Sequence, residues 1–350
     1  MRASRAAPSP DPRPASRRAT APPRPDLDSW AVTEHVVGVD RLLARVAGTA
    51  HDVLQLAPGT LDARLHVFRA RGFEAGGGEV NLPLRAQGRT LPHLATITLR
   101  LACPGGGVVN GRRVGTGSVV VWRPGATYDG IAPAGDRWVS LLVPPDELPR
   151  RAGAARRGTW WRWSTSLLTA ELSPEELAEA TALVERTETL AGGAPTVVPE
   201  RVATDVRARW IDLAGAVFAR AEPAPAPRGA TWSATLDVRA ADRYLRGHLG
   251  ATVYLADVCR ATGVPPRTLQ AAFALVLGCS PMAYLETLRL HAALRALRAD
   301  EGAVPATVRD VAKRVGFSHY PRFSAAFRAR FASSPGEILQ RSRETRAAGR

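Results

Sequence analysis

Histidine and cysteine are the residue types in this 350-residue sequence that could bind a metal ion, so their spacing is the first test of chemistry. His66 and His93 lie in segments with the character of β-strands and could act as metal ligands. No His-x-His pattern with a downstream Glu and His accompanies them, which favours polar or surface positions for both. The three cysteines, Cys103, Cys259 and Cys279, have neither the even number of a disulfide framework nor the spacing of zinc ligands. We therefore expect no metal site, no cofactor and reduced cysteines.

The basic side chains offer a different chemistry, which is the binding of a polyanion. All of the 47 basic residues except Lys313 are arginines, as is typical of a GC-rich genome, so arginine content alone says little about function. Their distribution says more, because residues 231–350 hold 18 basic and 9 acidic side chains and carry +9 of the total charge of +15. A basic C-terminal third is the electrostatic footprint of a domain that binds nucleic acid. Codon usage that merely left a basic, solvated surface is the alternative.

The same C-terminal third contains two copies of one helical unit. DVCRATG at 257–263 aligns with DVAKRVG at 310–316 at an offset of 53 residues, and LQAAF at 269–273 aligns with FSAAF at 323–327 at an offset of 54. Each copy is followed by Ser-Pro, which suits the N-cap and the first residue of a further helix. The sequence therefore predicts a duplicated all-helical domain.

Each copy has the spacing of a helix-turn-helix unit. A short helix is followed by Gly263 or Gly316 and then by a second helix with large apolar anchors at positions i and i+4. Glycine suits the turn because it adopts positive φ angles without a steric cost. A leucine-rich helix over 281–299 would fix the spacing between the two units. Such a tandem could insert into two successive major-groove faces, about one DNA turn apart.

Residues 236–340 resemble the DNA-binding domain of the AraC/XylS family of transcription regulators. The resemblance is closest in DVAKRVGFSHYPRFSAAFRARFASSPGEIL at 310–339. It implies a seven-helix domain with recognition helices at 266–276 and 319–331. The sequence departs from the family pattern at Ala271 and Ala325, where arginine is usual, at Pro265, where a serine cap is usual, and at Ala332, where glycine is usual. Base reading must then depend on other positions.

The resemblance also implies which side chains face the DNA groove. On the first recognition helix they are Arg267, Thr268, Gln270 and Ala271. Arginine can make paired hydrogen bonds to guanine and glutamine to adenine, so Arg267 and Gln270 are the expected base readers. On the second helix the implied residues are His319, Tyr320, Arg322 and Ser324, with Arg328 one turn on and nearer the DNA backbone. The second unit often contributes mainly phosphate contacts in this family, and an ordinary solvent-exposed helix face is the alternative for both helices.

The N-terminal two thirds of the chain have a different organisation. Residues 1–28 are rich in proline, arginine and alanine and predict a disordered tail. Short apolar segments at 61–70, 93–102, 117–124 and 137–144, separated by glycine and proline, predict an antiparallel sandwich or small barrel. With GSVVVWRPG at 117–125 and sheet-then-helix order, residues 29–220 resemble the cupin-like sensory domains fused to such DNA-binding modules.

Two amphipathic helices are predicted after these strands. Ser173-Pro174-Glu175-Glu176 is a capping box that begins the first, and the second runs over 202–219. Their apolar faces could cover the sheet or pair with a second chain. Three prolines within 221–231 then predict an extended linker, followed by the DNA-binding domain at 232–342.

The sequence thus predicts a multidomain protein with a cupin-like β-sandwich or barrel and helices, followed by an all-α tandem helix-turn-helix domain. We expect a cytoplasmic, nucleoid-associated regulator that binds promoter double-stranded DNA, RNA polymerase and a small-molecule effector, forms a homodimer and is not an enzyme. No stretch of about 18 uncharged apolar residues suggests a membrane span. One alternative is a cupin-type metal-dependent enzyme fused to a DNA-binding module, which metal analysis would reveal. The other is a nonspecific architectural binder, which competition with random DNA would reveal.

Overall fold

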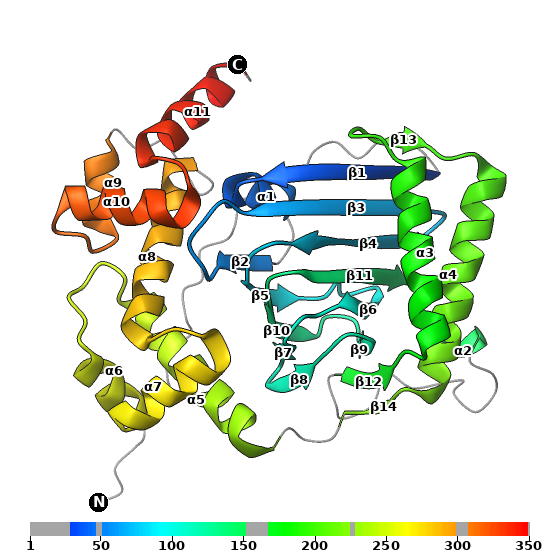
Figure 1. Cartoon of the computed structure of the whole chain (residues 1–350), viewed down its shortest axis with the longest axis horizontal. Helices are drawn as coiled ribbons and strands as arrows, with labels where there is room; N and C mark the ends of the chain where they lie inside the picture. Colours follow the sequence, from blue (N-terminus) through cyan, green and yellow to red (C-terminus); the bar gives the residue numbers. More distant parts are fainter. Residues whose placement is uncertain (1–28, 47–50, 152–166, 225–227, 299–306, 349–350) are drawn as a thin grey trace, which may run out of the picture.

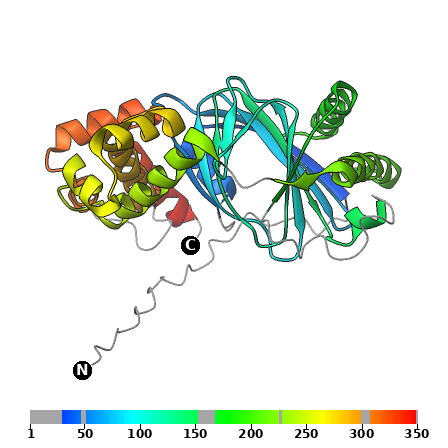
Figure 2. The same cartoon turned by 90° about the horizontal axis from the view of Figure 1, so that it is seen from below.

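The computed structural model describes residues 29–46, 51–151, 167–224, 228–298 and 307–348. In these residues the chain forms a β-rich N-terminal domain and a helical C-terminal domain, which lie side by side (Figures 1 and 2). The N-terminal domain consists of a helix pair, a large sheet and a smaller sheet, and the smaller sheet faces the C-terminal helices. The predicted tail at 1–28 lies outside the described residues.

The large sheet, sheet A, is antiparallel and has nine strands within the described ranges. Its order is β13-β1-β3-β4-β11-β6-β9-β12-β14. The strands are β1 (Ser29–Val37), β3 (Asp62–Ala70), β4 (Phe73–Val80), β6 (Ala95–Ala102), β9 (Ser118–Trp122), β11 (Asp136–Val143), β12 (Leu167–Glu171), β13 (Thr196–Val197) and β14 (Glu222–Pro223). The four apolar segments that predicted strands correspond to β3, β6, β9 and β11, and the predicted β-sandwich or barrel is confirmed.

The smaller sheet, sheet B, has the order β2-β5-β10-β7-β8 in the described part of the chain. Its strands are β2 (His51–Gln55), β5 (Leu84–Arg89), β7 (Gly107–Val109), β8 (Arg112–Val114) and β10 (Thr127–Ala132). Two short helices, α1 (Val39–Val46) and α2 (Glu147–Arg151), complete this part of the domain. Sheet A and sheet B enclose the interior of the N-terminal domain (Figure 2).

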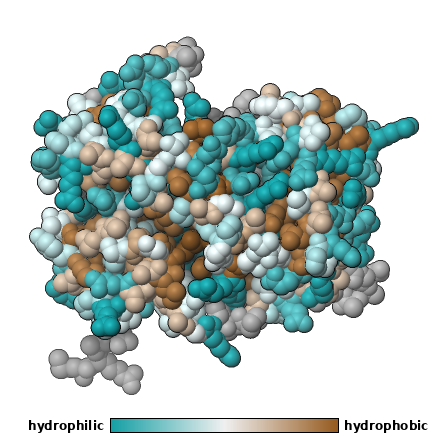
Figure 3. All heavy atoms as spheres, viewed as in Figure 1, coloured by the Kyte–Doolittle hydropathy of each residue, from teal (hydrophilic) through white to brown (hydrophobic). Residues whose placement is uncertain are grey.

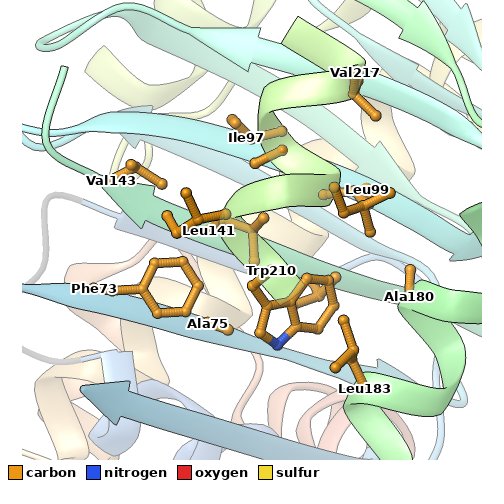
Figure 4. Close-up of a cluster of buried hydrophobic side chains, with 14 of the residues drawn as sticks. Phe73, Ala75, Ile97, Leu99, Leu141, Val143, Ala180, Leu183, Trp210 and Val217 are labelled. Atoms are coloured by element: carbon orange, nitrogen blue, oxygen red, sulfur yellow. The ribbon is translucent and has the colours of Figure 1, made fainter. Parts of the chain in front are cut away.

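Helices α3 (Pro174–Leu190) and α4 (Glu200–Arg220) cover the outer face of sheet A. The capping box forms as predicted, because the Ser173 hydroxyl accepts from the Glu176 N–H and the Glu176 carboxylate accepts from the Ser173 N–H. Trp210 lies fully buried at the centre of this contact, against Phe73 and Leu183 (Figure 4). The apolar faces of both helices therefore cover the sheet.

That packing removes the reason for expecting these two helices to pair with a second chain. Their outward faces carry ion pairs, of which Arg186–Asp205 (2.8 Å) links α3 to α4. Large apolar side chains that are exposed in the described residues are scattered over several elements, and Figure 3 shows hydrophilic and hydrophobic residues interspersed on one face of the molecule. The homodimer remains a prediction without support from an apolar face on α3 or α4.

The C-terminal domain has seven helices among the described residues, as the resemblance implied. They are α5 (Gly229–Gly247), α6 (Leu255–Thr262), α7 (Pro266–Leu277), α8 (Pro281–Arg298), α9 (Val308–Arg314), α10 (Tyr320–Phe331) and α11 (Pro335–Ala348). Within the predicted linker at 221–231, β14 pairs with β12 and α5 begins at Gly229. No single helix of the described residues is long and apolar enough to cross a membrane, and α7 with α8 passes that test only as a pair bent by 54°.

Candidate nucleic-acid interface

The first helix-turn-helix unit consists of α6 and α7. Gly263 ends α6 with φ +72°, and its N–H donates to the Cys259 carbonyl at 2.8 Å. Leu269 and Phe273 on α7 are fully buried, as their i and i+4 spacing predicts. The Phe273 ring meets Tyr284 of α8 edge-on, with 5.6 Å between ring centroids. The turn and the anchors therefore fix which face of α7 remains outside the core.

The second unit consists of α9 and α10 and repeats this construction. Gly316 has φ +89° in the turn, and a Cβ at this position would overlap the Leu249 carbonyl oxygen. Phe323 and Phe327 on α10 are fully buried, with 5.6 Å between their ring centroids. Glycine is needed here both for the backbone angle and for the close approach of the α5–α6 connection.

Helix α8 joins the two units as one continuous helix (Figure 1). Ser280 begins α8 by accepting a hydrogen bond from the Ala283 N–H at 3.2 Å. Ser334 caps α11 in the same way and forms a full capping box with Glu337. Both Ser-Pro pairs therefore have the role that the repeat predicted.

The predicted groove-facing residues of α7 all lie on its exposed face. Arg267, Thr268, Gln270 and Ala271 are exposed, whereas Leu269 between them is buried. In the described residues no ion pair engages Arg267, so its guanidinium can bind a ligand. Pro265 precedes the helix without a side-chain cap, so the N-terminal N–H groups of α7 lack the hydroxyl partner that a serine would provide.

The predicted residues of α10 divide into two groups. His319, Arg322 and Arg328 are exposed, whereas Tyr320 and Ser324 are half-buried. His319 is the N-cap of the helix, because its Nδ1 accepts from the Arg322 N–H at 3.3 Å. The guanidinium of Arg309 lies 5.5 Å from the centre of the Tyr320 ring. His319 and Tyr320 thus also help to build the unit, and Arg322 and Arg328 are the cations of this set that remain fully available.

Helix α10 ends at Phe331, and its C-cap Ala332 has a left-handed backbone with φ +53°. Its N–H donates to the Arg328 carbonyl at 2.8 Å. A left-handed conformation costs a residue with a Cβ about 1–2 kcal/mol relative to glycine. The departure from the family pattern at this position therefore makes the end of α10 less stable than glycine would.

A second candidate site lies between the two sheets of the N-terminal domain. In the middle of sheet A, strand register places Gly76 beside Ser140 and Ser140 beside Thr98 on the face opposite α3 and α4. The Thr98 and Ser140 hydroxyls are 3.1 Å apart. These inner residues keep partial exposure, whereas the outward residues beside them belong to the buried core. On sheet B, Ala86 is paired with Gly130. Small residues thus occupy these inward positions of both sheets.

The two histidines considered as metal ligands do not come together. His66 is buried beneath α3, with its Nδ1 3.9 Å from a carboxylate oxygen of Glu188. Burial, with the positive charges of Arg137 and Arg64, lowers the pKa of His66 to about 4. His93 is exposed between β5 and β6. In the described part of the chain no three His, Cys, Asp or Glu side chains are grouped so as to hold a metal.

Comparison with known proteins agrees with this geometry. Residues 258–341 match the protein family described as "Helix-turn-helix domain". Over 120 residues the chain is 37% identical to the "Probable thc operon regulatory protein" of Rhodococcus erythropolis, covering 34% of this chain and 33% of that protein. Residues 258–341 form a helix-turn-helix domain of the AraC type. The match ends within α11, so the AraC-type domain includes both units and α8.

Further relatives match over similarly short stretches. The chain is 36% identical over 97 residues to the "HTH-type transcriptional activator RhaS" of Escherichia coli O139:H28, covering 28% of this chain and 34% of that protein. A solved structure of a "probable AraC family transcriptional regulator" from Rhodopseudomonas palustris is 32% identical and covers 31% of this chain and 97% of its own, with a TM-score of 0.29. The chain spans about a third of the length of the curated relatives it matches.

A set of charged residues that the sequence did not indicate lies between sheet B and the helices of the C-terminal domain. Asp52 and Asp129 of sheet B bind arginines of α5 and α8, and Arg85 of β5 is 1% exposed although charged. The partners stand up to 243 residues apart in sequence, so no local pattern reveals them. The burial of Arg85 as a charged group and the partial burial of the others are visible only in the folded protein.

Proposed function

We propose that the protein is a sequence-specific, double-stranded-DNA-binding transcription regulator. The observation that carries the proposal is the pair of AraC-type units joined by α8, with Arg267 and Gln270 exposed on α7 and Arg322 and Arg328 exposed on α10. Helices with one buried and one polar, cationic face are the elements that enter a major groove. The excess positive charge of residues 231–350 supports binding of a polyanion.

The exposed residues then divide by chemistry. Arg267 reads guanine through paired hydrogen bonds, and Gln270 reads adenine. Thr268 and Ala271, each next to one of these residues, contact the base edges or sugars. On α10, Arg322 enters the groove with Ser324 beside it, His319 and Tyr320 contact the DNA at the start of the helix, and Arg328 binds phosphate.

In this proposal the N-terminal domain regulates the activity of the DNA-binding domain. A small-molecule effector binds between sheet A and sheet B, where Gly76, Thr98 and Ser140 are small and partly exposed and the two hydroxyls can form hydrogen bonds. The DNA-bound protein acts on RNA polymerase at promoters in the cytoplasm and catalyses no reaction. A homodimer would place a second copy of the AraC-type domain on the same promoter.

Selection of duplexes from a random-sequence library by the full-length protein tests the DNA-binding proposal. We expect a defined site with salt-sensitive affinity that exceeds binding to random DNA by on the order of a thousandfold or more. An Arg267→Ala, Gln270→Ala double variant should lose the preference and keep the binding to random DNA. Enrichment of no sequence, or equal affinity for selected and random duplexes, would identify a nonspecific binder instead.

A separate variant tests the proposed binding of an effector between the sheets. Gly76→Leu would place a side chain between the sheets, and a Cβ at Gly76 meets only ordinary contacts, with Val67 at 3.7 Å. A compound that shifts the thermal unfolding of the wild-type protein should lose that effect in Gly76→Leu, while binding of the selected duplex is unchanged. A compound that stabilises both proteins equally binds elsewhere.

A further inference from the structure

Strand β2 binds two helices of the C-terminal domain, although it belongs to the N-terminal domain. Asp52 accepts from Arg246 of α5 at 2.7 Å and from Arg295 of α8 at 2.9 Å. Three residues on, the Gln55 N–H donates to Nε2 of His291 on α8 at 2.9 Å. The five-residue strand is therefore bound to the first helix of the domain and to the helix that joins the two units.

The same strand also reaches the recognition helix of the second unit. The Gln55 side chain donates to the Arg330 carbonyl of α10 at 2.7 Å, and the Arg330 guanidinium donates to the Leu56 carbonyl. Slightly further along, the Gly59 N–H donates to the Ala329 carbonyl at 3.1 Å. These bonds hold the C-terminal end of α10, so its position depends on residues 52–59.

A second group of polar contacts binds α5 and α8, which pack against the first unit, to the neighbouring strands. Asp129 of β10 accepts two hydrogen bonds from Arg85 and one from Arg239 of α5 at 3.0 Å. Arg85 also donates to the Tyr284 hydroxyl of α8, which donates to Asp242 of α5, both at 2.6 Å. A buried charge that loses its partner is strongly destabilising, so these pairs specify one docked geometry.

Apolar packing agrees with this double attachment. Leu54 of β2 is 1% exposed and belongs to the core of the first unit, with Leu269 and Phe273. The core of the second unit, which contains Phe331, extends to Leu61 of the N-terminal domain. In the described residues the two units thus have separate cores, and both cores include N-terminal residues.

We infer that residues 52–59 act as a splint that sets the position of α10 relative to α7 and so the spacing at which the two units read DNA. The splint is a positioning device, because Asp52 and Gln55 touch no DNA. Gln55 holds α10 directly, and Asp52 holds α5 and α8, against which the recognition helices pack. It rests on the proposed DNA-binding function. Val53 belongs to the core that contains Phe331, and Leu54 belongs to the core of the first unit, so adjacent residues of the splint pack into both cores.

The test compares a complete selected duplex with duplexes in which one or the other half is randomised, using the full-length protein. Asp52→Asn should weaken binding to the complete duplex by about tenfold, which is a typical size for the coupling between two sites. Binding to each half-randomised duplex should not change. Gln55→Ala should do the same, because it removes the hydrogen bond to the Arg330 carbonyl. Asp205→Asn is the matched control, since it removes the same charge from an exposed ion pair on α4, and it should change neither affinity.

Hydrogen exchange gives a readout that needs no DNA. The Gln55 amide, which donates across the interface, should exchange faster in Asp52→Asn, and the α10 amides should exchange faster in Gln55→Ala. The splint is refuted if both variants bind complete and half duplexes in the wild-type ratio, or if they bind the complete duplex more tightly, which would make the interface inhibitory. Failure to select any duplex would refute the DNA-binding proposal instead. In that case, unchanged hydrogen exchange in both variants would refute the splint on its own.

Discussion

The buried histidine of α8 predicts how the stability of the protein depends on pH. The His291 side chain is fully buried, and its neutral Nε2 accepts the Gln55 N–H. Burial, with the positive charges of Arg295 and Arg330, lowers the pKa of His291 to about 3, although the Gln55 carbonyl and Asp52 oppose the shift. The folded protein therefore does not protonate His291 at a pH at which the unfolded chain does.

The sign and size of the effect follow from this difference. An unfolded histidine has a pKa of about 6.5, so below that pH the unfolded state binds a proton that the folded state rejects. The free energy of unfolding therefore falls as the pH falls from about 6.5 toward 3. One unit below the unfolded pKa, at pH 5.5, the loss from His291 is about 1.4 kcal/mol. His66, whose pKa is also lowered, adds a separate loss in the same direction.

Urea unfolding at pH 7.5 and 5.5 measures this loss in the wild-type protein and in His291→Gln. Glutamine can still accept the Gln55 N–H and cannot titrate, so the variant should lose about 1.4 kcal/mol less on acidification than the wild type. His93→Gln makes the same substitution at an exposed histidine and serves as the control. Equal losses in His291→Gln and the wild type would refute the argument that His291 is held neutral at the domain interface.

Two further predictions concern the DNA-binding units. Arg267→Ala should cost roughly 1–3 kcal/mol of binding free energy on the selected site and relax the preference at one base pair. Arg328→Ala should instead weaken binding to all sequences and reduce the slope of log affinity against log salt concentration by about one. Titrations on single-base variants of the site at several salt concentrations measure both effects. A uniform loss for Arg267→Ala would remove it from the base readers. Gly263→Ala should lower the free energy of unfolding by about 1–2 kcal/mol. Only the left-handed backbone angle contributes there, because nothing lies within 4 Å of an added Cβ. Gly316→Ala should cost more, because its Cβ would also overlap backbone atoms. Equal melting temperatures for these two variants would contradict the close contact at Gly316.

The duplicated domain was predictable because its signals are local. Glycine at a turn, Ser-Pro at a helix start and apolar residues at i and i+4 each depend on a few neighbouring residues, and the helices form where these patterns place them. The exposed face of α7 followed from the same periodicity, since the positions between the buried anchors must point outward.

The N-terminal domain was predicted only in part because its strands depend on distant neighbours. FEAGGGEV at 73–80 forms β4, although three successive glycines weaken a strand. The structure supplies the reason at Gly77, where a Cβ would overlap the Trp138 carbonyl oxygen of the neighbouring strand. Only the pairing of β4 with β11 creates this requirement, and no local pattern contains it.

The domain interface could not be predicted for a related reason. Asp52 and Arg295 are unremarkable charged residues in sequence, and the abundance of arginine hides those that are buried. The apolar faces of α3 and α4 were compatible with a sheet or with a second chain, and only the position of Trp210 against sheet A decides between them.

Footprinting of the full-length protein on its selected duplex tests the central claim most directly, because it reports how many recognition helices enter the DNA and how far apart. The account predicts two protected major-groove segments on one face of the duplex, about 10 base pairs apart, with Arg267→Ala losing protection in one segment and Arg322→Ala in the other. A single protected segment, or protection that does not depend on either arginine, would contradict the claim that α7 and α10 together read the DNA.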